Sequence, residues 1–303
     1  MKLFFILLVF FLLDLFSFNT ANSQDMDTLI YGGIDTVPFK TKFKNEFIEE
    51  LSGIEHSGKE NLYYVIPQSK KEAHIFLCSI NITKESIQVN FDSLIQLNYG
   101  PLEAESIRVN PANNGVYIAE EGNGKSYIHQ LDNNFNLKTI YASSKEQRHN
   151  KGYEGICFSP KGGIIYMGLE SPKEGTVTNI ISYNLNTKIE KTYDYALDIL
   201  SLDYKKDNGI TELLTLNDSA LIVVERAFLG PKNGSSIRVY KAIIPTIGNK
   251  IKKVKLLTDF SASPKIDNIE GVSFSASGNE LIFVSDDNGN VHQQTLFICM
   301  KIE

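Results

Sequence analysis

Short apolar stretches alternate with polar positions along the chain, and turns that contain Gly or Asn separate them. Five times, an apolar strand begins near a small or acidic residue, turns, and returns as a second strand that ends close to polar or acidic residues. The five expected hairpins are Leu51–Gln68, Ala104–Glu121, Tyr153–Glu170, Ile210–Glu225 and Ile269–Asp287. Because equivalent positions recur every 49 to 58 residues, the pattern predicts the blades of an all-β propeller.

Further pairs of β-rich segments lie between the hairpins, so that each blade has four expected strands. These pairs are Ala73–Ile80 with Ser86–Leu97, Ser126–Leu131 with Leu137–Ala142, Asn179–Leu185 with Ile189–Tyr195, and Ile237–Ile244 with Ile251–Phe260. The last blade has only Gln293–Ile302 left, and we expect Thr28–Phe39 to supply its fourth strand. This pairing of the two ends would close the ring and remove an exposed sheet edge.

The pattern therefore predicts five blades of four antiparallel strands in a single domain that spans residues 24–303. Six blades are the alternative if the stretch Tyr193–Asp207 contains additional strands. The apolar residues Phe39, Phe43, Phe47 and Leu51 recur at helical spacing, which predicts a short helix before the first blade.

Acidic residues recur at equivalent positions of the hairpins. The opening positions align as Ser52, Glu105, Glu154, Glu212 and Glu270, and the return strands end at Gln68, Glu121, Glu170, Glu225 and Asp286. The start and the end of an antiparallel hairpin lie at the same edge, so these side chains are expected to meet at one mouth of the central channel. Clustered carboxylates repel one another unless a cation neutralises them. Oxygen ligands favour Ca²⁺, while the alternative is that each glutamate caps backbone amides of a neighbouring blade.

The N-terminal stretch contains one basic residue, an apolar run and small residues near Ser23, as is typical of a cleaved secretory signal over residues 1–23. We therefore expect a secreted or periplasmic protein with no membrane span after cleavage. The formal net charge of −6 gives no basic footprint for nucleic acid, and we expect a monomer. The cysteines Cys78, Cys157 and Cys299 lie in apolar strands and are expected to be buried thiols, with a Cys78–Cys299 bridge as the alternative.

Three segments resemble the signature blocks of the "esterase-like activity of phytase" family. They are YEGICFSPKGGIIYMGLESP, ITELLTLNDSALIVVERAFLGPKNGSSIRVYK and NIEGVSFSASGNELIFVSDDNGNVHQQTLFICMKI. The resemblance runs from about Leu51 to the C-terminus, and it implies an exported propeller that hydrolyses phosphoesters or other esters. The chain departs from the family where Gly289-Asn290 follow Asn288, and blade one lacks acidic residues at Ser52 and Gln68, which leaves the channel mouth asymmetric.

The residues support a hydrolysis that depends on a divalent cation. Calcium held by Glu105, Glu154, Glu212 and Glu270 would bridge the oxygens of a small phosphorylated or ester substrate, and Glu170, Glu225 or Asp286 would orient the attacking water. Arg226 and His149 are the expected substrate-binding residues, whereas Arg108 and Arg238 are expected to connect blades. No Gly-x-Ser-x-Gly motif is present, which disfavours serine chemistry. The alternative is a non-catalytic, calcium-stabilised propeller that binds a ligand or a protein partner.

Overall fold

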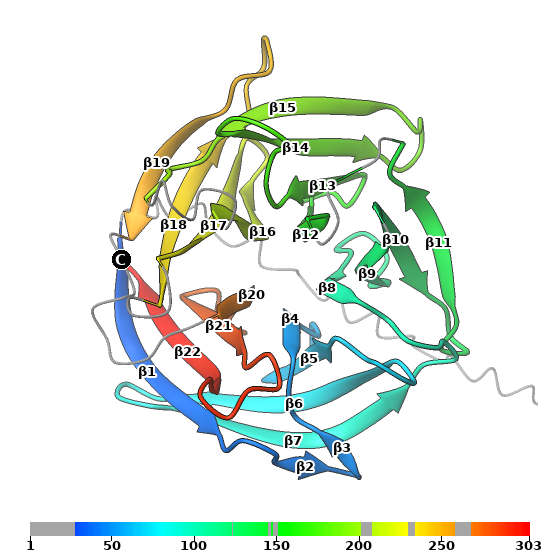
Figure 1. Cartoon of the computed structure of the whole chain (residues 1–303), viewed down its shortest axis with the longest axis vertical. Coiled ribbons are helices and arrows are strands. Elements are labelled where there is room, and N and C mark those ends of the chain that lie inside the picture. Colours follow the sequence, from blue (N-terminus) through cyan, green and yellow to red (C-terminus); the bar gives the residue numbers. More distant parts are fainter. Residues whose placement is uncertain are drawn as a thin grey trace, which may run out of the picture.

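The computed structural model of the chain describes residues 28–122, 124–144, 147, 151–200, 208–229, 234–257 and 268–303. Within these residues, five four-stranded antiparallel sheets surround a central axis like the blades of a propeller (Figure 1). The predicted all-β class and the five blades are confirmed, and the alternative of six blades is wrong. The expected signal peptide, residues 1–23, lies outside the described residues.

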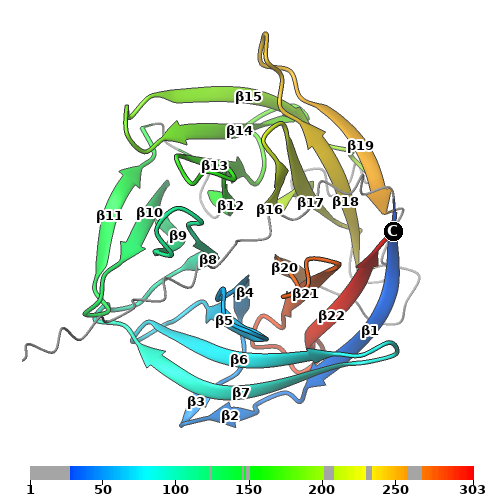
Figure 2. The same ribbon diagram turned by 180° about the vertical axis from the view of Figure 1, so that it is seen from behind.

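Blades one to four each run outward from the axis in chain order, as the reverse view also shows (Figure 2). Blade one contains β4 (Leu51–His56), β5 (Leu62–Pro67), β6 (His74–Ile82) and β7 (Ile87–Gln96). Blade two contains β8 (Ala104–Val109), β9 (Val116–Gly122), β10 (Lys125–Leu131) and β11 (Leu137–Ala142). Blade three contains β12 (Tyr153–Phe158), β13 (Ile164–Leu169), β14 (Val177–Asn184) and β15 (Glu190–Ala196). Blade four contains β16 (Asn208–Asn217), β17 (Ala220–Phe228), β18 (Ser235–Ile243) and β19 (Lys252–Leu257).

Blade five combines the two ends of the chain and closes the ring. It contains β20 (Asn268–Phe274), β21 (Glu280–Asp286), β22 (Thr295–Ile302) and, as its outermost strand, β1 (Leu29–Val37). β1 pairs antiparallel with β22, from Leu29 opposite Ile302 to Val37 opposite Thr295. The predicted closure by the N-terminal strand is therefore confirmed.

The segment before blade one is a hairpin, and the predicted short helix is wrong. Its strands are β2 (Lys42–Phe43) and β3 (Glu46–Phe47). The two residues between them, Lys44 and Asn45, have φ angles of 48° and 74°. Two consecutive left-handed residues are typical of the tight turn of a β-hairpin and cannot continue a right-handed helix. The helical spacing of Phe39, Phe43, Phe47 and Leu51 therefore did not indicate a helix.

The apolar core is divided among the contacts between neighbouring blades. Each of five hydrophobic clusters in the described chain combines residues of two adjacent blades, as Ile66 of blade one and Ile107 of blade two do. Cys78, Cys157 and Cys299 are buried free thiols, as predicted, and the alternative Cys78–Cys299 bridge is not formed. Packing of flat sheet faces against each other thus stabilises the ring and fixes the orientation of each inner strand.

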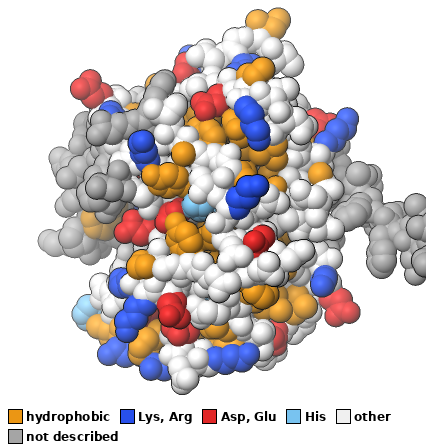
Figure 3. All heavy atoms as spheres, turned by 90° about the vertical axis from the view of Figure 1, so that its right-hand side faces the viewer, with side chains coloured by type: hydrophobic (Ala, Val, Ile, Leu, Met, Phe, Trp, Pro, Cys, Tyr) orange, Lys and Arg blue, Asp and Glu red, His pale blue; other side chains and the backbone are white. Residues whose placement is uncertain are grey.

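The outer surface is mixed in character. The face of the ring that carries β11 shows acidic, basic and hydrophobic side chains interspersed (Figure 3). Among the residues that the structure describes, no helix has the length and apolar character needed to cross a membrane.

Candidate active site

Each inner strand carries a β-bulge close to its first residue. The register with the second strand shifts between Leu51 and Gly53, Ala104 and Ser106, Tyr153 and Gly155, Ile210 and Glu212, and Ile269 and Gly271. The residues inside the bulges are Ser52, Glu105, Glu154, Thr211 and Glu270. A bulge redirects a side chain and is frequent beside functional sites. The equivalent residue of blade four is therefore Thr211, and not Glu212 as the sequence spacing predicted.

The second strand of each hairpin contributes one more equivalent position. It comes one residue after the partner of the residue that precedes the bulge: in blade four Ile210 precedes the bulge and pairs with Glu225, and the next residue is Arg226. The corresponding residues of the five blades are Gln68, Glu121, Glu170, Arg226 and Asp286. Blade four thus supplies a cation where blades two, three and five supply carboxylates.

All of these positions except Ser52 and Thr211 line a cavity of about 310 Å³ at the channel mouth, which we name the acidic cavity. It is lined by Gln68, Glu103, Glu105, Glu121, Lys151, Glu154, Glu170, Arg226, Asn268, Glu270, Asp286 and Asn288. We refer to Glu105, Glu154 and Glu270 as the inner carboxylates and to Glu121, Glu170 and Asp286 as the outer carboxylates. The structure therefore brings together five of the predicted acidic site residues, Glu105, Glu154, Glu170, Glu270 and Asp286, with Arg226.

Two cations neutralise part of this charge. Lys151 donates a hydrogen bond from Nζ to Oε1 of Glu170 at 2.7 Å. Arg226 donates to Oε1 of Glu270 and to Oδ1 of Asn268, and its Nη2 lies 3.5 Å from Oε1 of Glu170. Among the described residues of the cavity lining, seven acidic side chains nevertheless face only these two cations. The acidic cavity consequently has an excess of negative charge whenever its carboxyl groups ionise.

Burial and mutual repulsion raise the pKa values of five carboxyl groups of the cavity. Burial, followed by repulsion from other acids, raises the pKa values of Glu105 and Glu154 well above their usual range, and the two carboxyl groups lie within hydrogen-bond reach of each other. Burial also raises the pKa of Glu270, although Arg226 opposes the shift. The pKa values of Glu121 and Asp286 rise to about 7, first through burial and then through repulsion from Glu170 and Glu270, respectively.

The donors of the acidic cavity match a hard divalent cation in type. They are carboxylate and amide oxygens, as Ca²⁺ prefers. In the described part of the chain, no three His, Cys, Asp or Glu side chains stand in a metal-binding arrangement. Arg226 is the cation that contacts Glu270, so a metal ion would have to displace this contact.

Glu212 does not line the acidic cavity, and its predicted placement at the mouth is wrong. Its carboxylate accepts hydrogen bonds from Ser106 Oγ at 3.0 Å and from its neighbour Leu213 N at 2.9 Å. Oε2 of Glu212 lies 2.8 Å from Nη2 of Arg108. Burial raises the pKa of Glu212 to about 8 although Arg108 opposes the shift. The hairpin of blade four contains two register shifts, which moved the sequence alignment by one residue.

Arg108 occupies the centre of the ring and connects four blades, as its predicted structural role requires. It donates to the carbonyl oxygens of Ile54, Leu213 and Val272 at 2.9 to 3.0 Å, and to that of its own neighbour Ile107 at 2.7 Å. The acceptors belong to the inner strands β4, β16, β20 and β8. Arg108 therefore fastens the inner strands together below the acidic cavity.

Glu225 also lies away from the cavity, between blades three and four, so its predicted catalytic placement is wrong. It accepts hydrogen bonds from Lys253 Nζ at 2.5 Å and from the hydroxyl group of Tyr195 at 2.8 Å. Arg238, predicted to connect blades, lies 3.5 Å from Glu225 and donates to the carbonyl oxygen of Asp198 at 2.8 Å. Neighbouring residues of a strand face opposite sides, so Arg226 enters the cavity while Glu225 packs between blades.

His149, predicted to bind substrate, lies outside the described residues. Lys151, which was not predicted, lies in the acidic cavity two residues before β12 begins. The sequence signal was a basic residue shortly before an inner strand, near the points at which Glu103 and Asn268 line the cavity in blades two and five.

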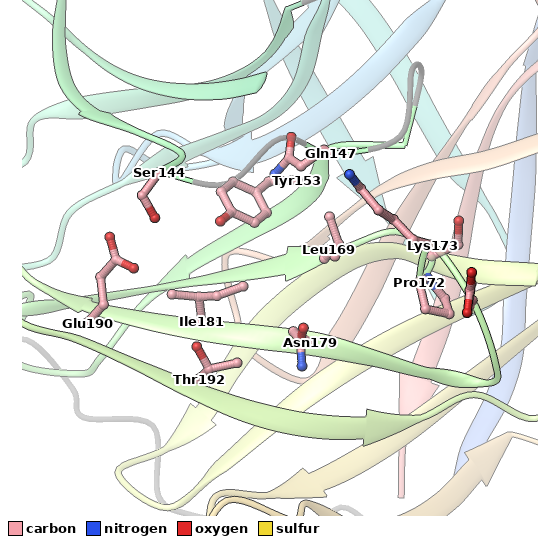
Figure 4. Close-up of a pocket in the computed structure, with 12 residues that line it drawn as sticks. Ser144, Gln147, Tyr153, Leu169, Pro172, Lys173, Asn179, Ile181, Glu190 and Thr192 are labelled. Atoms are coloured by element: carbon pink, nitrogen blue, oxygen red, sulfur yellow. The ribbon is translucent and has the colours of Figure 1, made fainter. Parts of the chain in front are cut away.

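A separate cavity of about 350 Å³ lies on blade three (Figure 4). Tyr153, Leu169 and Ile181 form an apolar part of its wall, and Lys173 and Glu190 lie at its edges. Tyr153 and Leu169 directly adjoin Glu154 and Glu170 in sequence, yet line this other cavity. The same hairpin therefore separates two cavities, and only the acidic cavity gathers carboxylates from several blades.

Comparison with known proteins identifies a family. The sequence matches the family model "Phytase-like: Esterase-like activity of phytase" over residues 47–289. No curated protein matches the sequence significantly.

Several solved structures are similar at low identity. A luciferin-regenerating enzyme is 13% identical, with a TM-score of 0.44, over 83% of this chain and 77% of that one. A protein from Lactobacillus plantarum is 12% identical, with a TM-score of 0.44, over 78% and 77%. The structure of U3-55K is 10% identical, with a TM-score of 0.41, over 84% and 68%. Similarity at this level says nothing about a reaction.

Proposed function

Because the chain belongs to the "esterase-like activity of phytase" family, we propose that it is a hydrolase of phosphoesters or related esters and that the acidic cavity is its active site. One observation carries this proposal. Three blades direct six buried or half-buried acids into one polar cavity that also holds Lys151 and Arg226. Fold alone does not determine a reaction, so the proposal rests on this arrangement of side chains.

The charge of the cavity makes a divalent cation part of the proposal. A phosphoester is an anion, and ionised carboxylates would repel it from the cavity. Ca²⁺ held by Glu105, Glu154 and Glu270 would reverse this repulsion, polarise the ester and offset the charge that develops during reaction. Glu212 and Glu225, also expected to act here, are excluded from the proposal because they lie outside the cavity.

Two outer carboxylates have the acid–base properties that hydrolysis needs. A group whose pKa lies near the working pH can both accept and release a proton efficiently, and the pKa values of Glu121 and Asp286 are both about 7. In the proposed reaction, one of them takes a proton from the attacking water as the new bond to phosphorus or carbonyl carbon forms. The ester bond then breaks, and a protonated carboxyl group gives its proton to the leaving oxygen.

The third outer carboxylate has a positioning role. Glu170 contacts both Lys151 and Arg226 and so fixes the two cations at the side of the cavity. We further propose that the protein acts after export, in the periplasm or outside the cell, on a small substrate and as a monomer.

Steady-state hydrolysis of p-nitrophenyl phosphate and p-nitrophenyl acetate, measured at increasing Ca²⁺ concentration, tests the function. We expect calcium-dependent turnover by the wild type and a loss of roughly 10² to 10⁴-fold in Asp286→Asn and Glu121→Gln. Asp218→Asn, at an exposed turn, is the matched control and should retain full activity. The melting temperatures of the variants in excess Ca²⁺ should remain close to that of the wild type.

An absence of turnover on both esters at every calcium concentration would refute the hydrolase. If Ca²⁺ then still raises the melting temperature, the alternative of a calcium-stabilised binding propeller replaces it.

A further inference from the structure

The hairpin of β18 and β19 in blade four projects beyond the outline of the ring (Figure 1, Figure 2). Its loop, residues 244–251, contains Ile247, which is 90% exposed and is the most exposed large hydrophobic side chain that the structure describes. Gly248 turns the chain there with a φ of 78°. One exposed apolar side chain is common on protein surfaces, so Ile247 alone indicates no partner, and its surroundings decide.

The loop has a defined position because other strands hold both of its arms. Asp194 of β15 donates its backbone N–H to the carbonyl oxygen of Asn249 at 2.8 Å, and its carbonyl oxygen accepts from the backbone N–H of Ile251 at 3.0 Å. The carboxylate of Asp194 also accepts a hydrogen bond from Nδ2 of Asn249 at 2.8 Å. On the other arm, Ile244 donates to the carbonyl oxygen of Ser219 at 2.9 Å. The tip is therefore presented to solvent on two anchored arms.

The same hairpin carries a concentration of positive charge. Residues 241–256 contain five lysines and no acidic residue, in a chain whose formal net charge is −6. Lys253 points inward and pairs with two acids between blades three and four, at 2.5 and 2.9 Å. Lys250, Lys252 and Lys255 are exposed. The projecting part of blade four is therefore cationic although the protein as a whole is acidic.

The lysines alone have a simpler explanation. β19 is the outermost strand of blade four, and exposed lysines on an edge strand prevent pairing with another chain. This explanation accounts for Lys252 and Lys255. It does not account for Val254, which lies on the same strand and is 50% exposed, or for Ile247, because exposed apolar side chains favour association. The combination of apolar and cationic side chains therefore indicates a surface that binds a partner.

An anionic lipid surface offers both contacts that this combination requires. Lipid phosphates attract lysines that lie close to the membrane. Apolar side chains can enter the interface, while lysine side chains keep their charged ends among the headgroups. A nucleic acid would match the charge but would offer no apolar phase to Ile247 and Val254.

The place of the hairpin in the ring suits contact with an anionic surface. β17 and β18 pair from Phe228 opposite Ser235 at one end to Ala220 opposite Ile243 at the other. Arg226 lines the acidic cavity near the first end, whereas the projecting loop follows Ile243 at the second end. The excess carboxylates of the acidic cavity therefore lie at the opposite end of blade four from the loop, so docking by the loop would not press them against lipid phosphates.

We propose that the projecting hairpin of blade four attaches the protein to anionic phospholipid membranes. Ile247 and Val254 enter the headgroup region, and the three exposed lysines contact lipid phosphates. The attachment is peripheral and leaves the acidic cavity open to solution. This inference goes beyond the proposed function and does not depend on it.

Tryptophan fluorescence tests the contact at the tip, because the chain contains no Trp of its own. Ile247→Trp places a single reporter in the loop. Val291→Trp, at a position that is 64% exposed between β21 and β22, is the control. On addition of vesicles of phosphatidylcholine and phosphatidylglycerol in equal parts, the emission of Ile247→Trp should shift to shorter wavelength. The emission of Val291→Trp should remain that of an indole in water.

Co-sedimentation of the whole purified protein with sucrose-loaded vesicles measures the affinity. We expect the wild type to bind these anionic vesicles roughly 100-fold more tightly than vesicles of phosphatidylcholine alone, and the difference should shrink as NaCl is added. Lys250→Gln/Lys252→Gln/Lys255→Gln should weaken binding to the anionic vesicles by roughly 100-fold, since each lysine near such a surface contributes about fivefold. Ile247→Asn should weaken it by roughly tenfold, because its apolar side chain no longer leaves water.

A matched variant separates this surface from the effect of overall charge. Lys40→Gln/Lys42→Gln/Lys44→Gln removes three exposed lysines around β2 and β3 and changes the net charge equally, yet it should bind anionic vesicles as the wild type does. The apolar N-terminal run of residues 1–23 is common to all variants, so binding through it would persist when the hairpin is changed.

Four results would overturn the inference. They are equal binding of the wild type to both kinds of vesicle, unchanged binding by the blade-four triple variant, equal losses in the two triple variants, and an unshifted emission of Ile247→Trp. A wild type that binds neither kind of vesicle would also overturn it and would leave a protein partner as the occupant of the hairpin.

Discussion

The guanidinium group of Arg108 connects four inner strands near the axis of the ring. Arg108 is 2% exposed, and it hydrogen-bonds to carbonyl oxygens on the inner strands of blades one, two, four and five. Its charge is matched by Glu212 and, at 3.6 Å, by Glu55. Glu212, which the sequence spacing assigned to the metal site, therefore pairs with Arg108, the residue that connects the inner strands.

Replacement of Arg108 by Met should destabilise the protein by about 3 to 5 kcal/mol, because it leaves buried carbonyl oxygens of four inner strands and the carboxyl group of Glu212 without their hydrogen-bond donor. Urea unfolding measures this change. The double variant Arg108→Met/Glu212→Gln should recover part of the loss, since an amide is neutral at every pH and its NH₂ group can donate hydrogen bonds. Lys138→Met, at an exposed position of β11, is the control. A loss below about 1 kcal/mol in Arg108→Met would contradict the central role of this residue.

The raised pKa values of the outer carboxylates predict a pH dependence of stability. Glu121 and Asp286 hold their protons up to about pH 7 in the folded protein, against usual pKa values of 4.5 and 3.8. Between these usual values and about pH 7 the folded state thus binds more protons than the unfolded state, so this contribution to stability is full below about pH 4 and is lost as the pH rises to about 7. The loss should be on the order of 1 to 3 kcal/mol per group.

Melting temperatures measured with a chelator between pH 4 and about pH 8 check this dependence. The wild type should lose stability as the pH rises, and Glu121→Gln/Asp286→Asn should lose less. A wild-type stability that instead increased relative to the double variant over this range would show that the sign is wrong.

The hairpin with a bulged inner strand is the element that builds the site. Its repetition in the sequence made the five blades and the closure by β1 predictable, because apolar alternation and turn residues recur at a regular interval. The acidic residues of blades two, three and five were located for the same reason. Thr211 was not recognised as the equivalent of the bulged acids, and Glu225 was assigned to the position that Arg226 occupies, although Arg226 itself was expected to bind substrate. A one-residue change of register reverses the face on which each side chain lies, and spacing alone does not reveal a bulge.

Glycine after the bulge allows the inner strands to approach closely. A Cβ atom on Gly155 would lie 2.5 Å from Leu213 N and 2.6 Å from Glu212 Cα, so the backbones of β12 and β16 are in direct contact. Gly155→Ala should destabilise the protein by about 1 to 3 kcal/mol or more, as measured by urea unfolding. Gly163→Ala, where a Cβ atom would have no neighbour within 4 Å, should have little effect. Equal effects of the two substitutions would contradict this packing.

The ring brings side chains of several blades together in one cavity at the channel mouth. Glu105, Glu154 and Glu270 belong to three separate blades, yet they line one cavity and repel one another there. Blade four breaks the five-fold pattern with Arg226, and blade one breaks it with Ser52 and Gln68. The channel mouth is therefore lined by acids from three blades, with Arg226 and Lys151 on one part of its wall. This arrangement suits a site that combines a cation with an anionic ester.

An electron-density map of crystals grown with Ca²⁺ tests most directly whether this mouth is a cation site. The account predicts one strong peak among Glu105, Glu154 and Glu270, surrounded by six to eight oxygen atoms at about 2.3 to 2.6 Å, with Arg226 moved away from Glu270. A mouth without such a peak at saturating Ca²⁺, with Arg226 still bound to Glu270, would contradict the account.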